Sequence, residues 1–184
     1  MNHYFFLENK KHSQKTVKIS KAGDLSILLL DWEKENIEEL SVIEQINGSD
    51  FNIIRDMATN KNLSFIDLSK TNIVNGGDYY YASYSTKNNE FGYSLFNGCE
   101  KLKKIILPKT IEEIGEFAFW FCSNLISLVI NSKVKSIKPD IWGGCGKLND
   151  VKIINNSNFH FENSILYDKN YNKNYCCFAS RNLW

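Results

Sequence analysis

The sequence carries no excess of charge of either sign. Its 184 residues include 22 Lys plus Arg and 21 Asp plus Glu, which leaves a formal net charge of +1. No global field is therefore available to attract nucleic acid or an anionic membrane surface. Proline is scarce too, with two residues, and no Pro- or Gly-rich stretch marks a linker. With 43% hydrophobic residues, these absences indicate one globular domain.

Long apolar segments are also missing. No window of about 20 apolar residues occurs, so we expect no transmembrane helix. The apolar run near the N-terminus spans only Tyr4 to Leu7, and Lys10 and Lys11 follow it, whereas a signal peptide begins with its positive charges. We therefore expect no membrane insertion and no signal peptide within this sequence. An export signal removed from a longer precursor is the alternative.

Groups that commonly carry catalysis are few. The histidines are His3, His12 and His160, and no zinc-protease, serine-hydrolase or phosphate-loop motif occurs. His160 and Glu162 fall on one face of a predicted strand, as a general acid/base pair could. An exposed surface pair is the preferred interpretation. We expect a protein that is not an enzyme and needs no cofactor, with a hydrolase as the disfavoured alternative.

The cysteines, in contrast, follow a strict pattern. Cys99, Cys122 and Cys145 lie 23 residues apart, and apolar columns keep the same period. These columns are Phe96/Phe119/Trp142, Leu102/Leu125/Leu148, Ile105/Leu128/Val151 and Leu107/Ile130/Ile153. A fixed period of this length predicts stacked repeats, because one repeat alone cannot bury its apolar side chains.

The cysteine spacing also limits the chemistry of the thiols. Metal sites place Cys or His ligands only a few residues apart, so a spacing of 23 predicts no metal site. The odd total of five argues against a fully paired disulfide framework. Buried free thiols that contact turn carbonyls are the favoured interpretation. For Cys176 and Cys177, a surface thiol or an intermolecular crosslink is considered as well.

An alternating segment in each repeat predicts a β-strand. The strands expected from this pattern are 102–107, 125–130 and 148–153, with 62–73 as an upstream copy and 37–42 as an irregular one. Equivalent strands stacked about 4.8 Å apart would form one parallel sheet.

Helices are expected only before the repeats. Phe51, Ile54 and Met57 lie at helical spacing after Ser49 or Asp50, either of which could be the N-cap. A capping helix is expected within residues 21–36.

The string LxxIxLPxxIxxIGxxAFxxCxxLxxLxI, from Leu102 to Ile130, resembles the BspA-like (Treponema-type) leucine-rich repeat. The third repeat departs from it, since Asn131 replaces the Pro and Lys138 the Gly. The resemblance implies an α/β fold: a right-handed leucine-rich-repeat solenoid with a parallel sheet, 23-residue repeats, an N-terminal helical cap and a C-terminal closing unit. It also implies a bacterial cell-surface or secreted binding module, often one that adheres to host matrix proteins or to other cells.

The expected organisation has four parts. They are a basic N-terminal extension at 1–20, an N-terminal cap at 21–61, leucine-rich repeats at 62–154 with a Tyr-rich insertion at 74–94, and a closing unit at 155–184. The closing unit is expected to be hairpin-like, with Asp168, Lys169 and Asn170 as its turn.

The outward face of the sheet is the first candidate binding surface. If the leucine columns point inward, alternation places two columns outward: Phe65, Lys104, Ser127, Asp150; and Asp67, Ile106, Val129, Lys152. The second column has two adjacent β-branched apolar residues between charges, a pattern typical of interfaces. An ordinary solvated sheet face is the alternative.

The tyrosine-rich insertion is the second candidate surface. It offers Tyr79, Tyr80, Tyr81 and Tyr84, whose amphipathic rings could contact a protein or stack on sugars. The same rings could instead pack over the first repeats as a flap. The sequence therefore favours a protein-binding module that uses the sheet face, with glycan binding through the insertion or a purely structural spacer as alternatives.

Overall fold

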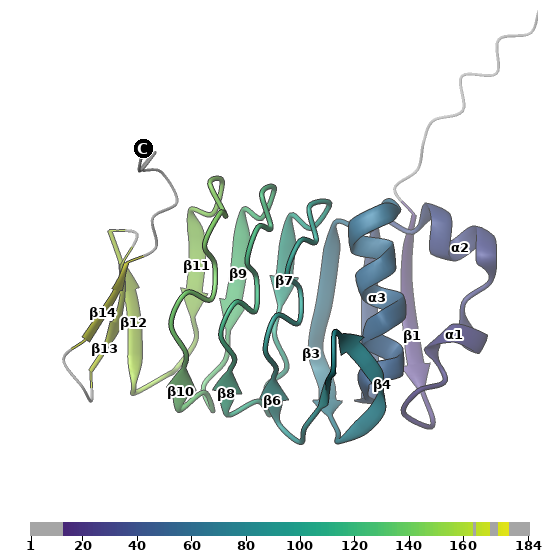
Figure 1. Ribbon diagram of the computed structural model, residues 1–184, viewed down its shortest axis with the longest axis horizontal. Helices are drawn as coiled ribbons and strands as arrows, with labels where there is room; N and C mark the ends of the chain where they lie inside the picture. The colour runs from purple at the N-terminus through teal and green to yellow at the C-terminus, as the bar shows by residue number, and fades with distance from the viewer. Residues whose placement is uncertain (1–12, 164, 170–172, 177–184) are drawn as a thin grey trace, which may run out of the picture.

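The computed structural model describes residues 13–163, 165–169 and 173–176. Its main layer is a six-stranded parallel sheet, whose strands lie side by side along the long axis of the molecule in Figure 1. This sheet confirms the expected α/β class with a parallel sheet. The strands in their order across the sheet are β1 (Gln14–Ile19), β2 (Glu39–Ile46), β3 (Phe65–Ile73), β7 (Lys104–Ile106), β9 (Ser127–Ile130) and β11 (Asp150–Ile153).

The register of the sheet follows the periodicity of the chain. Lys104 of β7 pairs with Ser127 of β9, which pairs with Asp150 of β11. Phe65 of β3 pairs with Lys104, so the longer connection between these strands leaves the pairing unchanged. The register of β2 with β3 shifts between Ser41 and Ile43, which marks a local irregularity in the first half of the sheet.

Strand β1 forms one edge of the sheet and lies within the segment that we expected to be a basic extension. Val17 and Ile19 are buried, Lys15 is half-buried and forms an ion pair with Glu33 of the segment that follows, and Lys18 is exposed. The strand was missed because its apolar pattern has only two members and lysines surround them. Residues 1–12 lie outside the described residues.

A second, narrower ladder of parallel strands runs along the lower side of the molecule in Figure 1. It consists of two-residue parallel strands, β6 (Glu90–Phe91), β8 (Glu113–Ile114) and β10 (Ser136–Ile137). The turns after them repeat their backbone conformation at intervals of 23 residues. The left-handed positions in these turns are Ser94, Phe117 and Asp140, then Gly98, Phe121 and Gly144.

Three helices precede or flank this ladder: α1 (Leu25–Leu28), α2 (Asp31–Asn36) and α3 (Gly48–Asn60). The expected single helix in 21–36 is thus two short ones. The N-cap of α3 is Asn47, whose Oδ1 accepts a hydrogen bond from the Ser49 backbone N at 3.0 Å, so neither Ser49 nor Asp50 is the cap. Helix α3 stacks beside the first turns of the repeats, where Ala58 O accepts a hydrogen bond from Lys101 N.

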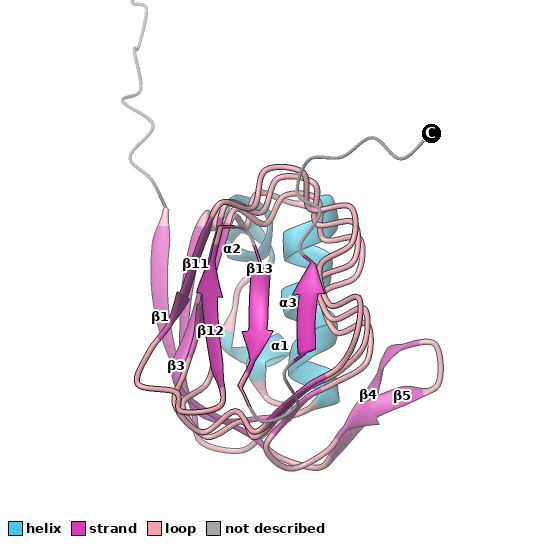
Figure 2. Cartoon of the chain, turned by 90° about the vertical axis from the view of Figure 1, so that its left-hand side faces the viewer, coloured by secondary structure: helices cyan, strands magenta, loops and turns pink. Residues whose placement is uncertain are grey.

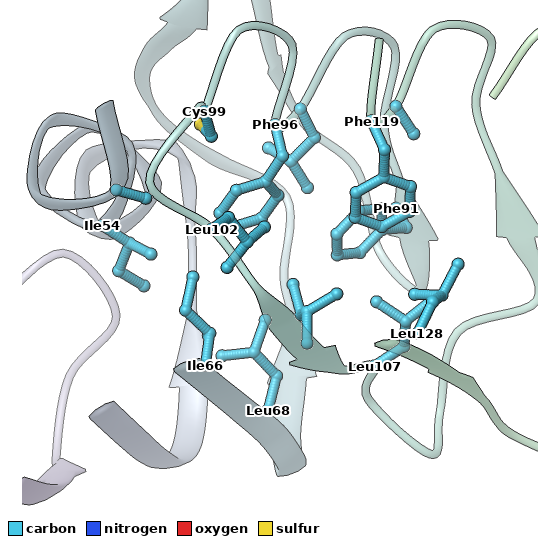
Figure 3. Close-up of a cluster of buried hydrophobic side chains, with 14 of the residues drawn as sticks. Ile54, Ile66, Leu68, Phe91, Phe96, Cys99, Leu102, Leu107, Phe119 and Leu128 are labelled. Atoms are coloured by element: carbon cyan, nitrogen blue, oxygen red, sulfur yellow. The ribbon is translucent and has the colours of Figure 1, made fainter. Parts of the chain in front are cut away.

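The core between the layers is a stack of aromatic and aliphatic side chains (Figure 3). Phe91, Phe96 and Phe119 are fully buried, and their ring centroids lie 5.2–6.3 Å apart in stacked geometry. Leu102 and Leu128 fill the space between these rings and the sheet, and both are fully buried. Each repeat therefore contributes at least one aromatic ring and several aliphatic chains to a single continuous core, and the first repeat contributes two rings, Phe91 and Phe96.

The described C-terminal part changes strand direction. Strands β12 (Phe159–Glu162), β13 (Ile165–Asp168) and β14 (Lys173–Cys176) form an antiparallel sheet. Phe159 and Leu166 are buried at 1% and 0% exposure, so this sheet packs onto the end of the core. The predicted turn at Asp168–Asn170 is described up to Lys169, and Cys177 lies outside the described residues.

Candidate binding surface

The sheet face brings all eight predicted residues into adjacent positions. In-register neighbours of parallel strands share a face, and the pairing extends both predicted columns onto β2 and β1. The resulting first row is Gln14, Glu39, Phe65, Lys104, Ser127 and Asp150. The second row is Thr16, Ser41, Asp67, Ile106, Val129 and Lys152.

Several side chains of the first row contact one another. The Lys104 ammonium lies 4.7 Å from the centroid of the Phe65 ring, within the range of a cation–π contact. Ser127 Oγ donates a hydrogen bond to Asp150 Oδ2 at 2.8 Å, and Lys152 Nζ lies 3.6 Å from the same oxygen. The face is thus partly ordered by its own contacts before any ligand arrives.

Two of the predicted contact residues offer little surface. Ser127 and Val129 are each only 7% exposed, because their strand lies between two neighbours whose side chains cover them. The prediction that these two side chains contact a partner is therefore corrected: they lie within the sheet face and support their neighbours there. Phe65, Asp67, Ile106 and Asp150 are half-buried and Lys104 and Lys152 exposed, so these six present the accessible chemistry.

A shallow hollow lies beside the second row, where β2 is irregular. It is lined by Thr16, Ser41, Asp67, Ser69 and Lys70 among others. Asp67 Oδ1 accepts a hydrogen bond from Ser69 N at 2.8 Å, which fixes the carboxylate at the rim. This hollow was not predicted, because β1, which contributes Thr16 to its lining, was not evident in the sequence.

In the insertion, strands β4 (Gly76–Tyr81) and β5 (Tyr84–Thr86) form a hairpin that packs on α3. Tyr80 lies in the core at 5% exposure, edge-on to Phe51, and its hydroxyl donates to Tyr93 O at 3.1 Å. Burial raises its pKa well above the usual value of 10. Tyr80 is therefore not available as a surface contact.

The other insertion tyrosines lie nearer the surface. Tyr79 is 64% exposed and Tyr84 is 42% exposed. The Tyr81 ring is half-buried beneath the Arg55 guanidinium, 5.3 Å from the ring centroid. The insertion thus combines both predicted roles: Tyr80 anchors a flap, while Tyr79 and Tyr84 remain accessible.

The cysteine column is buried, and its three thiols are free. Cys122 Sγ donates to Phe96 O and Cys145 Sγ donates to Phe119 O, each at 3.0 Å. The prediction of buried free thiols that contact turn carbonyls is confirmed for these two. Within the described residues no group of three His, Cys, Asp or Glu side chains could hold a metal ion.

His160, the other candidate, has its ring stacked on Tyr167 across the β12–β13 pair, with centroids 4.5 Å apart. Glu162 is exposed at the end of β12. His160 is half-buried, so of the expected exposed pair only Glu162 is exposed.

We expect alkaline pH to destabilise the fold through the buried thiols. The neighbouring Cys145 thiol and burial raise the pKa of Cys122 well above 9.0, and burial raises the pKa of Cys99. The unfolded chain then releases these protons first, so stability is complete below about pH 9 and falls as the pH rises above it. Denaturant titrations between pH 8 and pH 11 in a reducing buffer should show this fall. Cys122→Ala should flatten the curve, and an unchanged slope in that variant would contradict the assignment.

Three consecutive strands of the parallel sheet, β7, β9 and β11, pair at 23-residue intervals, and each of their repeats has a buried cysteine and at least one buried aromatic ring. This is the pattern of the leucine-rich-repeat class. The sequence model of the family described as the BspA type leucine rich repeat region (6 copies) matches residues 80–180, more than half of the chain. The chain belongs to this BspA-type family. No curated protein matches the sequence significantly.

The class carries a general expectation for function. Leucine-rich repeats of this type are an interaction fold and generally not an enzymatic one. In the described part of the chain, no helix has the length and apolar character needed to span a membrane.

Proposed function

We propose that this chain is a non-enzymatic protein-binding module of adhesion type, which presents the outer face of its six-stranded sheet to a protein partner. The observation that carries the proposal is the pair of in-register rows, which place the apolar Ile106 beside Asp67, on the same strand as Lys104 and two strands away from Lys152. An apolar centre with a charged rim is the anatomy of protein interfaces.

The proposal includes an architecture and a location. The repeats would form an open right-handed solenoid, with α1, α2 and α3 as its N-terminal cap and β12–β14 as its closing unit. The boundaries proposed from the sequence are those given above, with β1 added to the cap. Family membership supports a bacterial cell-surface or secreted protein whose partner is a host matrix or cell-surface protein.

A binding screen against extracellular-matrix proteins tests this function. We expect the double variant Ile106→Glu/Lys152→Glu to lose at least tenfold in affinity, because it places two carboxylates at the centre of the face, beside Asp150. The matched control is Ile27→Glu/Lys133→Glu, which makes the same two changes at exposed positions away from the sheet. It should bind within twofold of the original chain.

Two outcomes would contradict the proposal. Equal affinity of the two variants would show that the partner binds elsewhere. Failure of every matrix and cell-surface protein to bind would favour a structural spacer.

A second candidate function, glycan binding, is favoured by the accessible rings of the insertion. Tyr79 and Tyr84 present 64% and 42% of their surface, respectively. Sugars stack on such rings through their apolar faces, while tyrosine hydroxyls offer hydrogen bonds. This candidate predicts binding that survives substitutions on the sheet face.

A further inference from the structure

A chain of aromatic ring contacts links the β4–β5 hairpin to the turns that follow β6 and β8. Figure 2 shows loops stacked beside this hairpin, on the side of the molecule away from the main sheet. The members of the chain of rings, here called the aromatic ribbon, are Tyr84, Tyr93, Phe117, Trp120 and Phe121. Consecutive ring centroids lie 4.4, 5.6, 4.9 and 5.5 Å apart. Phe121 is 56% exposed and Tyr84 42%, and the three rings between them are half-buried.

Two rings of the ribbon stand at backbone positions that disfavour them. Phe117 and Phe121 have φ values of 57° and 56°, in the left-handed region. The equivalents of Phe121 in the adjacent turns are Gly98 and Gly144, and those of Phe117 are Ser94 and Asp140. Bulky residues are strained at such φ values, and strained residues cluster at binding and catalytic sites. The equivalent turns of the neighbouring repeats therefore form without aromatic residues at these two positions. The backbone conformation of the turn does not require Phe117 or Phe121.

The next turn leaves room for the rings. A Cβ atom at Gly143 would lie 2.1 Å from the Trp120 ring, and one at Gly144 would lie 2.6 Å from the Phe121 ring. Trp120 and Phe121 thus pack one face on backbone that carries no side chain. This support holds the rings in place at the surface, as preorganised binding platforms require.

The base of the ribbon is fixed to helix α3. Arg55 donates hydrogen bonds to the carbonyls of Ser94 at 3.1 Å and Asn97 at 3.3 Å, and also to Leu95 O. Its guanidinium is therefore committed to the turn and to the Tyr81 ring. Asn97 Nδ2 lies 3.4 Å from Tyr81 Oη, so the polar groups beside the rings include a neutral amide and a hydroxyl.

The chemistry of the ribbon differs from that of the sheet face. No ring residue carries a charge at neutral pH, and its own hydrogen-bonding groups are the Tyr84 and Tyr93 hydroxyls and the Trp120 indole N–H. We propose that the aromatic ribbon binds a neutral oligosaccharide, whose C–H faces would pack on the rings while its hydroxyls bond to these uncharged groups. This inference rests on the second candidate function, glycan binding, and places the binding site mainly on the turns of the repeats rather than on the insertion.

Titration with neutral hexasaccharides tests the inference, with cellohexaose, maltohexaose and chitohexaose as the probes. Binding should be saturable with a Kd of about 1 mM or lower and should change the tryptophan fluorescence. Trp120→Phe should weaken binding in calorimetry, because the indole N–H donor is lost, and should also remove most of the fluorescence change, because the indole is lost. Tyr84→Ser/Phe121→Gly should weaken binding at least tenfold.

The matched control is Ile126→Ser, which removes an exposed apolar side chain outside the ribbon. It should bind the sugars as the original chain does, and so should the sheet-face variant Ile106→Glu/Lys152→Glu. Tyr84 and Phe121 are exposed and Trp120 is half-buried, and melting curves verify that the ribbon variants remain folded.

Three results would overturn the inference. They are no binding of any neutral hexasaccharide, equal affinity of the Tyr84→Ser/Phe121→Gly variant, and binding only of an anionic polysaccharide or a proline-rich peptide. If the original chain binds a neutral hexasaccharide but no matrix or cell-surface protein, the sheet-face function alone is overturned, so the two proposals fail separately.

Discussion

Phe119→Ala is expected to lower the free energy of unfolding by about 3–5 kcal/mol. The Phe119 ring is fully buried and stacks on Phe91 at 5.2 Å and on Phe96 at 6.3 Å. Its removal leaves a cavity in the middle of the aromatic stack. The surrounding backbone, held by parallel pairing on both sides, has little freedom to collapse into it.

Denaturant titration measures this loss, and Phe121 provides the control. Phe121 belongs to the same turn but is 56% exposed and has a left-handed φ. Phe121→Gly relieves that strain and should leave stability unchanged or slightly higher, within about 1 kcal/mol. A loss below about 1 kcal/mol for Phe119→Ala would refute the continuous core described above.

Asp50→Ala is the substitution of a polar residue with the largest expected effect. The carboxylate is fully buried and accepts hydrogen bonds from the backbone N–H groups of Gly23 at 2.7 Å, Leu25 at 3.0 Å and Asn47 at 2.9 Å. It therefore ties the start of α3 to the segment that forms α1. Alanine would leave three N–H groups without an acceptor, and we expect a loss of about 3–5 kcal/mol.

Asp50→Asn and Asp56→Ala are the comparison variants. The amide introduced by Asp50→Asn would keep one acceptor oxygen, so that substitution should recover part of the stability. Asp56 is exposed on the same helix and accepts a hydrogen bond from Asn60 Nδ2 at 2.8 Å, so its replacement should cost less than about 1 kcal/mol. Similar melting temperatures for Asp50→Ala and Asp56→Ala would show that the carboxylate does not hold the two helices together.

The sequence predicted best where the chemistry repeats. The residues of one apolar column have the same buried environment in every repeat. Leu102, Leu125 and Leu148 therefore show which side of their strands faces the core, even when the other elements are unknown. Outside the repeats each segment had to be judged alone. The strand containing Val17 and Ile19 was missed, and Asp50 was interpreted as a local cap although its partners lie 25 and 27 residues away.

The candidate surfaces were predictable only in part. Alternation along the strands is enough to assign Lys104 and Ile106 to the outward face, because side chains alternate strictly in a strand. It does not give exposure, which depends on neighbours across the sheet, and so Val129 was overvalued. The aromatic ribbon was missed although it left a signal, since Phe121 aligns with Gly98 and Gly144 in the 23-residue pattern.

The reversal of strand direction after β11 has a consequence for the length of such a molecule. The first repeat contacts α3 through Lys101 N and Ala58 O, and β12 follows the last repeat, whereas the middle repeat pairs through β9 with a strand of the same 23-residue pattern on each side. A further unit of 23 residues added before β12 would meet the same neighbours as the unit it displaced. It would lengthen the outward rows by about 4.8 Å. The reach of the surface can therefore be set by duplication within the gene, without redesign of either end.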